Sequence, residues 1–354
     1  MNKIINLLKE KKSIPVDKFI DTALYNKKFG YYMKKNPFGE KGDYITSPLV
    51  SNLFGEMIAI WCVSFWEHLK KPKKILLVEF GPGDGSLCCD LLNTFKNFND
   101  FYDAVEIKLV EKSSKLKKIQ KEKIKNKKVR WINNIKEVNY GPVIFLGNEF
   151  FDSLPIKQVL KKNNSYFERH ISFSNESNKI KFIYKKAEKS LVKKIKKLNI
   201  YSKTNFIEYP LDGIKYLELI AKKIKKFDGG LLTFDYGYTK AKNHYTLQSV
   251  IKHKYTNILS HPGNADITSH VNYELFALFL KKHNLHVEKI VTQSEFLQKL
   301  GIIERANLLA KKISFKGKIN MFYRLNKLLN SDEMGYLFKV LFVKKKGKKF
   351  SLGF

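Results

Sequence analysis

An apolar run that ends in three closely spaced glycines constrains the fold of this chain more than any other feature. In the segment LLVEFGPGDGS a buried strand is predicted to end at Phe80, and Gly81, Gly83 and Gly85 form a tight turn before a helix begins. Glycine lets the backbone come close to a ligand at the carboxyl end of the first strand of an α/β fold, and a helix N-terminus favours an anionic group. The turn therefore predicts a ligand site at the start of an α/β domain.

The residues of the turn favour S-adenosylmethionine over two other ligands of glycine-rich turns. A Walker loop needs a lysine after its last glycine, and none stands here. A dinucleotide-binding turn has glycine or alanine at its sixth position, where this chain has Ser86. Asp84 would repel a pyrophosphate, which S-adenosylmethionine lacks. We therefore expect S-adenosylmethionine as cofactor, no metal ion, and a class I methyltransferase with a Rossmann-like α/β fold.

Alternation of apolar runs with helical segments predicts a mostly parallel sheet with helices on both faces. The expected strands are 73–81, 105–111, 127–133, 142–149 and 229–237. The segment 335–346 is expected to be an antiparallel edge strand. Residues 156–226 are too many for a simple crossover and include alternating stretches, so they predict an inserted β-rich subdomain followed by helices.

We accordingly divide the chain into four segments. These are a helical N-terminal region with an aromatic-rich loop at 1–72, the two halves of the methyltransferase core at 73–155 and 227–354, and the inserted subdomain at 156–226. Within the first segment, Ser47 and Pro48 are typical of a helix start. An apolar stripe from Val50 to Leu69 then predicts a core-facing helix.

The net charge of +34 is a surface property rather than the mark of a nucleic-acid site. Only four of the 67 basic residues are arginine, the side chain that reads guanine edges and clamps phosphates. The lysines are spread along the whole chain, as in a protein from an AT-rich genome. We therefore expect no specific nucleic-acid partner.

Cysteine usage and hydropathy point to the bacterial cytoplasm. The three cysteines, Cys62, Cys88 and Cys89, form no metal-binding or disulfide pattern. No apolar run reaches the roughly 18 residues of a membrane helix, and the N-terminus lacks signal-peptide features. We expect no membrane insertion and cannot read an oligomeric state from the sequence.

A carboxylate at the end of the second strand is the next candidate for cofactor binding. Glu111 stands 30 residues after Gly81, where its carboxylate can accept both ribose hydroxyls. Asn134, after the third strand, could reach the adenine, although asparagine is also common in turns. Thr46, before the helix start, and Asn148, at the end of the fourth strand, complete the predicted cofactor-binding residues.

The segment GNEFFDSLP, after the fourth strand, carries the candidate catalytic acids. Amino-methylases that act on nucleic acid often have [DNS]-P-P-[YFW] here, whereas this chain has Glu149 at the place of the first proline. A carboxylate at this position suits a positively charged methyl acceptor better than it suits a nucleobase. Glu149 and Asp152 are three residues apart and could hold a guanidinium together. His270 or Asp266 could then receive the proton, although an isolated histidine is more often structural.

Several segments in the same order resemble the MidA-like family. They span about residues 30–306, with one more near the end: GYYM…PFGEKGDYITSP, FGEMIAIW, VEFGPGDGSL, NEFFDSLPI, LLTFDYG, TLQSVIKHKY, PGNADITSHV, SEFLQKLGIIERA and MGYLFKVL. The resemblance implies a seven-stranded methyltransferase fold and symmetric dimethylation of an arginine in a respiratory complex I subunit, so a protein substrate. This chain departs from the family at Asp84, where arginine is usual, and at Pro48–Ser51, where PEIS is usual.

Two other functions stay open at this point. The basic charge would suit a nucleic-acid or other small-substrate methyltransferase, which the missing P-P-[YF] and the scarcity of arginine oppose. A non-catalytic complex I assembly factor could keep the same fold, since fold alone does not prove activity.

Overall fold

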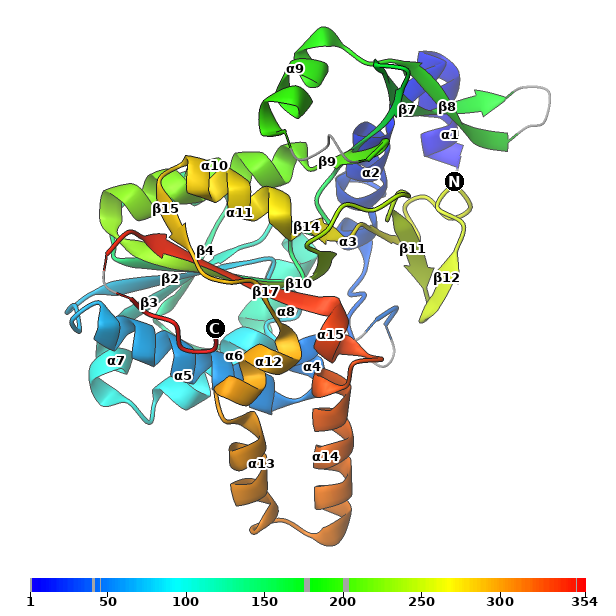
Figure 1. Cartoon of the computed structure of the whole chain (residues 1–354). Helices are drawn as coiled ribbons and strands as arrows, with labels where there is room; N and C mark the ends of the chain where they lie inside the picture. The colour runs from blue at the N-terminus through cyan, green and yellow to red at the C-terminus, as the bar shows by residue number, and fades with distance from the viewer. Residues whose placement is uncertain (1, 40–41, 45, 175–178, 200–203, 348) are drawn as a thin grey trace. The chain divides into compact units, whose positions relative to one another are not determined.

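The computed structural model shows two compact units, each built from several stretches of the chain (Figure 1). It describes residues 2–354 apart from 40–41, 45, 175–178, 200–203 and 348. Unit 1 comprises Met1–Tyr44, Phe151–Leu217 and Tyr238–Phe279, and unit 2 comprises Ile45–Phe150, Glu218–Gly237 and Leu280–Phe354. Unit 1 thus combines the inserted subdomain with residues of the N-terminal and C-terminal segments.

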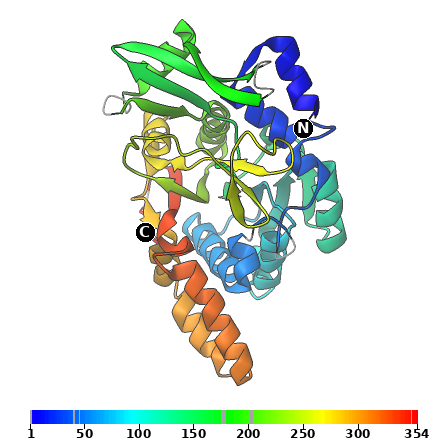
Figure 2. The same ribbon diagram turned by 90° about the vertical axis from the view of Figure 1, so that its right-hand side faces the viewer.

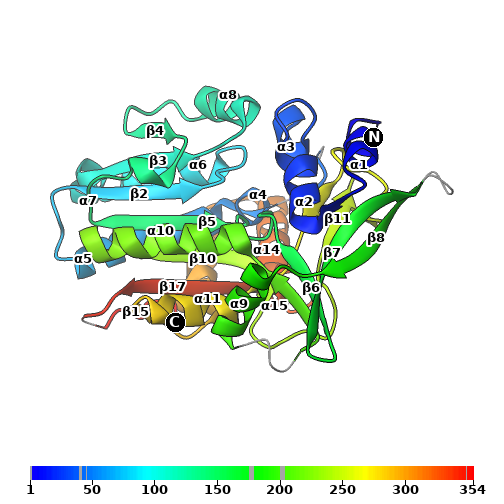
Figure 3. The same cartoon turned by 90° about the horizontal axis from the view of Figure 1, so that it is seen from above.

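Unit 2 is built on a sheet whose main path has seven strands. Their order is β4 (Val129–Ile132), β3 (Val105–Val110), β2 (Ile75–Phe80), β5 (Val143–Asn148), β10 (Gly229–Tyr238), β17 (Phe338–Lys345) and β15 (Leu285–Val287), as Figure 3 shows. The first five strands pair in parallel. This order confirms the predicted mostly parallel, seven-stranded α/β sheet.

The position of β17 corrects one expectation. The strand is antiparallel to β10, as predicted. It is not an edge strand, however, because β15 and β16 (Val291–Thr292) pair along its other side. The apolar residues from Phe338 to Val343 are therefore buried in the sheet together with Lys344, whereas Lys339 is half-buried and Lys345 is exposed.

Helices cover the sheet of unit 2, and aromatic side chains fill the core. In α5 (Asn52–His68) Trp61 stacks on Phe65, and both contact Phe342 of β17 edge-on. Each large apolar side chain buried in this way contributes about 1.5–3 kcal/mol. The predicted core-facing stripe is confirmed. The remaining helices of this unit are α6 (Ser86–Phe95), α7 (Asn99–Ala104), α8 (Ser114–Lys123), η1 (Ile135–Glu137), α12 (Gln293–Lys299), α13 (Ile302–Ala310), α14 (Phe315–Leu329) and α15 (Met334–Leu337).

The helix start expected at Ser47 is divided in two. A single turn, α4 (Ser47–Val50), is followed by extended backbone at Ser51, whose hydroxyl accepts the Leu53 N–H and caps α5. Ser47 does not cap a helix. Its hydroxyl donates instead to Gln293 Oε1, at 3.2 Å.

Unit 1 contains two small antiparallel sheets and a helical N-terminus. The first sheet has the order β1 (Ser13–Pro15), β7 (Ser165–Ser174), β6 (Lys157–Lys162) and β9 (Phe206–Tyr209), with β8 (Lys179–Lys186) paired to β7. The second has β12 (Lys254–Thr256), β11 (Gln248–Ile251) and β13 (Asp266–Thr268). The other elements are α1 (Asn2–Lys11), α2 (Val16–Tyr25), α3 (Tyr31–Lys34), α9 (Lys189–Leu198) and β14 (Val271–Asn272), while α10 (Leu211–Phe227) and α11 (Tyr273–Lys282) continue from one unit into the other. The first sheet confirms that the inserted segment is β-rich.

Within the part of the chain that the structure describes, no helix is long and apolar enough to cross a membrane.

Candidate cofactor and acceptor site

The glycine turn adopts a backbone that other residues rarely reach. Gly81, Gly83 and Gly85 all have positive φ, at 57°, 57° and 85°. Gly85 is the N-cap of α6, and its N–H donates to the carbonyl of Pro82. Left-handed backbone at three of five positions requires glycine, because a side chain there costs about 1–2 kcal/mol per residue. Three of the five residues from Gly81 to Gly85 therefore carry no side chain where the turn follows the carboxyl end of β2.

Asp84, within the turn, is held by the start of α6. Its carboxylate accepts the Ser86 N–H at 3.0 Å and the Ser86 hydroxyl at 2.9 Å. Lys123, at the end of α8, lies 2.7 Å from the same carboxylate. The negative charge that would repel a pyrophosphate is thus partly balanced by a lysine from the neighbouring helix.

Glu111 lies beside this turn, as the sequence predicts. Its carboxylate accepts the Ser113 N–H at 2.7 Å and the Gln120 side-chain amide at 3.2 Å. The same Gln120 amide donates to the carbonyl of Gly83 at 2.8 Å, so one side chain connects the acid and the turn. Burial raises the pKa of Glu111, and the hydrogen bonds from Ser113 and Gln120 offset part of that rise.

Two residues of this region were not predicted from the sequence. Gln120 is fully buried, and its side-chain oxygen accepts the indole N–H of Trp131 at 2.8 Å. Glu79, in β2, is buried too, and burial together with the charge of Asp84 raises its pKa to about 8. Both carried a signal: Gln120 is one turn after Leu116 on the apolar face of α8, and Glu79 interrupts an apolar strand.

Glu149 has an unusual backbone at the end of β5. Its φ is 53°, a left-handed value that costs a long side chain about 1–3 kcal/mol. The Glu149 N–H donates to the carbonyl of Phe234 at 2.8 Å. Its carboxylate accepts the Ser47 N–H and the Asn148 side-chain amide, each at 3.1 Å. These contacts fix both the backbone and the carboxylate of the predicted acid.

The remaining predicted cofactor residues are placed differently. Thr46 is the N-cap of α4, and its carbonyl accepts the N–H groups of Leu49 and Val50. Asn148 is half-buried, and its side-chain oxygen has no hydrogen-bond partner among the described residues. Asn134 is exposed, and its side chain caps η1 in a capping box with Glu137. A contact of Asn134 with adenine would compete with that cap and stays a prediction.

Asp152 and His270 lie in unit 1, whereas Glu149 lies in unit 2. The carbonyl of Asp152 accepts the Ser269 N–H at 3.0 Å, which joins the segments that carry Asp152 and His270. Burial, with help from Lys242 and His244, lowers the pKa of His270 to about 4, so the imidazole is neutral at pH 7. The catalytic roles of both residues stay predictions.

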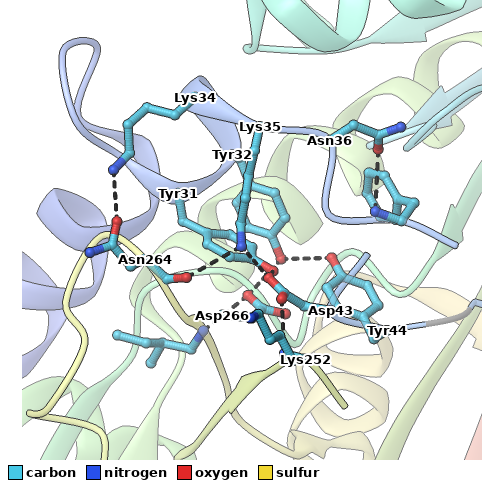
Figure 4. A network of polar contacts seen from close by, with 12 residues as sticks. Tyr31, Tyr32, Lys34, Lys35, Asn36, Asp43, Tyr44, Lys252, Asn264 and Asp266 are labelled. Carbon is cyan, nitrogen blue, oxygen red and sulfur yellow. Dashed lines mark hydrogen bonds and ion pairs between the residues drawn. The ribbon is translucent and has the colours of Figure 1, made fainter. Parts of the chain in front are cut away.

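The aromatic-rich loop of unit 1 forms a network around two buried acids, shown in Figure 4. The Tyr32 hydroxyl lies 2.9 Å from Asp266 and 3.2 Å from the Tyr44 hydroxyl. Tyr31 donates to Asp43 at 2.6 Å, and Lys35 forms an ion pair with Asp43. Burial and the charge of Asp152 raise the pKa of Asp266 to about 7, which makes it a better base near neutral pH than His270.

Across the described residues, no group of three or more His, Cys, Asp or Glu side chains is placed to hold a metal ion.

Comparison with known proteins identifies the class to which this fold and turn belong. A crystal structure of a superfamily member from Burkholderia thailandensis, bound to S-adenosyl-homocysteine, superposes with a TM-score of 0.84 at 21% identity, covering 99% of this chain and 93% of the other. A native crystal structure from the same organism gives 0.82. The chain therefore has the fold of S-adenosylmethionine-dependent methyltransferases.

Sequence comparison gives the family. A family model for S-adenosyl-L-methionine-dependent methyltransferases matches residues 57–291. The protein arginine methyltransferase NDUFAF7 of Xenopus laevis is 30% identical over 96% of this chain and 83% of its own length, and that of Homo sapiens is 28% identical over 92% and 78%. The chain belongs to this family of S-adenosylmethionine-dependent methyltransferases, and its cofactor is S-adenosylmethionine.

Proposed function

We propose that this chain methylates an arginine side chain of a protein, and that the acceptor is a subunit of respiratory complex I. The names of its relatives support an arginine acceptor. The observation that carries the proposal is Glu149, a carboxylate on strained backbone whose oxygen is fixed by Ser47 and Asn148. The symmetric pattern of dimethylation and a bacterial cytoplasmic location belong to the same proposal.

The residues of unit 2 fit the cofactor. The three left-handed glycines carry no side chain of their own at the turn, and the N-terminus of α6 would face the methionine carboxylate. Glu111, beside the turn, would accept hydrogen bonds from the ribose hydroxyls. The Asn148 side-chain oxygen would accept from the cofactor's ammonium group.

Glu149 would hold the acceptor. When bound, S-adenosylmethionine would supply the methyl group: the methyl–sulfur bond breaks as the bond to a guanidinium nitrogen forms, S-adenosylhomocysteine leaves, and the proton of that nitrogen passes to water. Glu149 would accept hydrogen bonds from the guanidinium and draw its positive charge away from the attacking nitrogen. Because Ser47 and Asn148 already orient the carboxylate, little ordering is required when the acceptor arrives.

The test separates binding from turnover in Glu149→Gln. Calorimetry should show S-adenosylmethionine affinity within about 3-fold of the parent. Transfer of isotopically labelled methyl to complex I subunits should fall about 100-fold, or about 2.7 kcal/mol, as expected for losing a hydrogen bond to a charged group. Glu122→Gln, on the exposed face of α8, is the matched control and should change neither value.

Three outcomes would count against the proposal. Loss of cofactor binding in Glu149→Gln would make Glu149 a cofactor or structural residue. Label recovered on nucleic acid, or on a protein residue other than arginine, would exclude the arginine acceptor. Cofactor binding without any methyl transfer by the parent would favour an assembly factor that does not catalyse.

A further inference from the structure

Exposed apolar side chains gather on one helical hairpin of unit 2. Nine of the eleven large hydrophobic residues found exposed in the described chain fall between Ile303 and Leu337. The hairpin consists of α13 and α14, joined by the four residues 311–314, and Figures 1 and 2 show the two helices side by side and extending away from the sheet of unit 2. An apolar cluster of this kind is typical of an interaction surface.

The apolar surface runs along the hairpin rather than only at its tip. Phe315, Ile319 and Phe322 are spaced four and three residues apart on α14, with exposed fractions of 78%, 56% and 38%. Tyr323, at 60%, adjoins them, and Leu308 on α13 is 56% exposed. The opposite face of α14, with Leu325 and Leu328, is buried in the core of unit 2. The exposed stripe is therefore a second apolar face.

Charge is segregated along the hairpin. Lys311, Lys312, Lys316 and Lys318 cluster around the tip, and no acidic residue occurs between Glu304 and Asp332. The acids Glu304, Asp332 and Glu333 are all exposed and lie at the base, in the first turn of α13 and after the end of α14. The base is mixed in charge, because Lys327 lies in the last turn of α14 and Arg305, in the first turn of α13, is paired with Glu56. A second hairpin in antiparallel orientation would place the lysines at the tip of each against the acids at the base of the other.

We propose that the hairpin binds a second copy of this chain, with two hairpins packed antiparallel about a two-fold axis near Tyr323. A two-fold contact uses the same surface on both partners, and it sets the lysines at each tip against the three acids at the other base. Seven exposed apolar side chains of about 100 Å² each offer roughly 700 Å² per chain, close to the roughly 800 Å² per partner of a stable interface. An anionic lipid surface would match the lysines at the tip but leave the three exposed acids at the base without a partner of opposite charge.

The first test is the mass of the full chain in solution. Light scattering at about 50 µM should give about twice the 41.4 kDa of one chain. Phe315→Glu combined with Ile319→Glu should give the monomer mass. Tyr255→Glu is the matched control, because Tyr255 in β12 is also 78% exposed but lies outside the hairpin, and it should stay dimeric. A monomeric parent, or a control that dissociates as far as the hairpin variant, overturns the proposal.

Two further variants test the orientation. Lys312→Glu with Lys316→Glu should weaken the dimer at least 10-fold, and adding Asp332→Lys with Glu333→Lys should restore it. Tyr323→Cys should form a disulfide-linked dimer under mild oxidation. The parent should not, because Cys62 and Cys88 are buried and the half-buried Cys89 lies on α6, outside the hairpin. Charge reversal without rescue overturns the antiparallel arrangement. Hairpin-dependent binding of a monomer to vesicles containing phosphatidylserine would assign the surface to lipid instead.

Discussion

Substitution of Gly85 by alanine tests how tightly the glycine turn is packed. Gly85 has φ at 85°, and an added Cβ would lie 2.9 Å from Cδ1 and 3.3 Å from Cγ1 of Ile124. Ile124 is 4% exposed and packed in the core of unit 2, so it cannot move aside freely. We expect Gly85→Ala to lose stability from two sources, the left-handed backbone and the crowding against Ile124.

Gly301 provides a matched control for the free-energy cost of placing alanine on left-handed backbone. It has φ at 83° and is the N-cap of α13, as Gly85 is the N-cap of α6, but its added Cβ would meet only Glu304 Oε2, at 3.5 Å. Gly301→Ala should therefore cost about 1–2 kcal/mol for the backbone alone. Gly85→Ala should cost about 1–3 kcal/mol more, the usual range for forcing a methyl group into a packed core.

Urea unfolding followed by tryptophan fluorescence measures this difference. All three tryptophans, Trp61, Trp66 and Trp131, lie in unit 2, so their emission reports the unit that contains both glycines. Ile124→Val removes the Cδ1 atom and should recover most of the extra loss when combined with Gly85→Ala. Equal losses for the two alanine variants, or no coupling to Ile124, would refute the steric argument.

Two further predictions concern residues that the sequence did not indicate. Because Glu79 has a pKa raised to about 8, the stability it contributes is full below the unfolded-state pKa of about 4.3 and is lost as pH rises toward 8, at up to about 1.4 kcal/mol per pH unit. Glu79→Gln should flatten that slope in urea unfolding between pH 5 and 8, and an unchanged slope would contradict the assignment. Gln120→Leu should lower S-adenosylmethionine affinity in calorimetry about 10-fold, because Glu111 and the Gly83 carbonyl lose their shared donor. Gln298→Leu, at an exposed position of α12, should leave the affinity unchanged, and equal affinities of Gln120→Leu and the parent would refute the role of Gln120.

The sheet was predictable because its strands are buried on both faces. β2 is buried at all six positions, and an apolar run that is interrupted only by Glu79 and ends at glycine is a signal that the local sequence carries. The place of β17 was not predictable in the same way. A run ending in lysines is typical of an edge, and only its pairing with β15, more than 50 residues earlier, places it inside the sheet.

The residues of the candidate site also fall into those that local sequence predicts and those whose surroundings depend on distant contacts. The glycines and Glu111 follow directly from strand ends, where the order of parallel strands brings side chains to one edge. Gln120 and Glu79 gain their surroundings from contacts that no local pattern contains, such as the Gln120 amide meeting Gly83, 37 residues away. Asn134 shows the opposite case, in which a local capping box accounts for the side chain.

The break between α4 and α5 and the strain at Glu149 have one explanation. Local spacing favours a single helix from Ser47 onward, yet the chain ends α4 after one turn and begins again with a cap at Ser51. The Ser47 N–H donates to the carboxylate of Glu149, 102 residues away, while the Phe234 carbonyl holds the Glu149 N–H. Backbone strain of about 1–3 kcal/mol persists only where surrounding contacts enforce it. The fold therefore holds the carboxylate of Glu149 in one orientation, which is what the proposed stabilisation of a transition state by Glu149 would require.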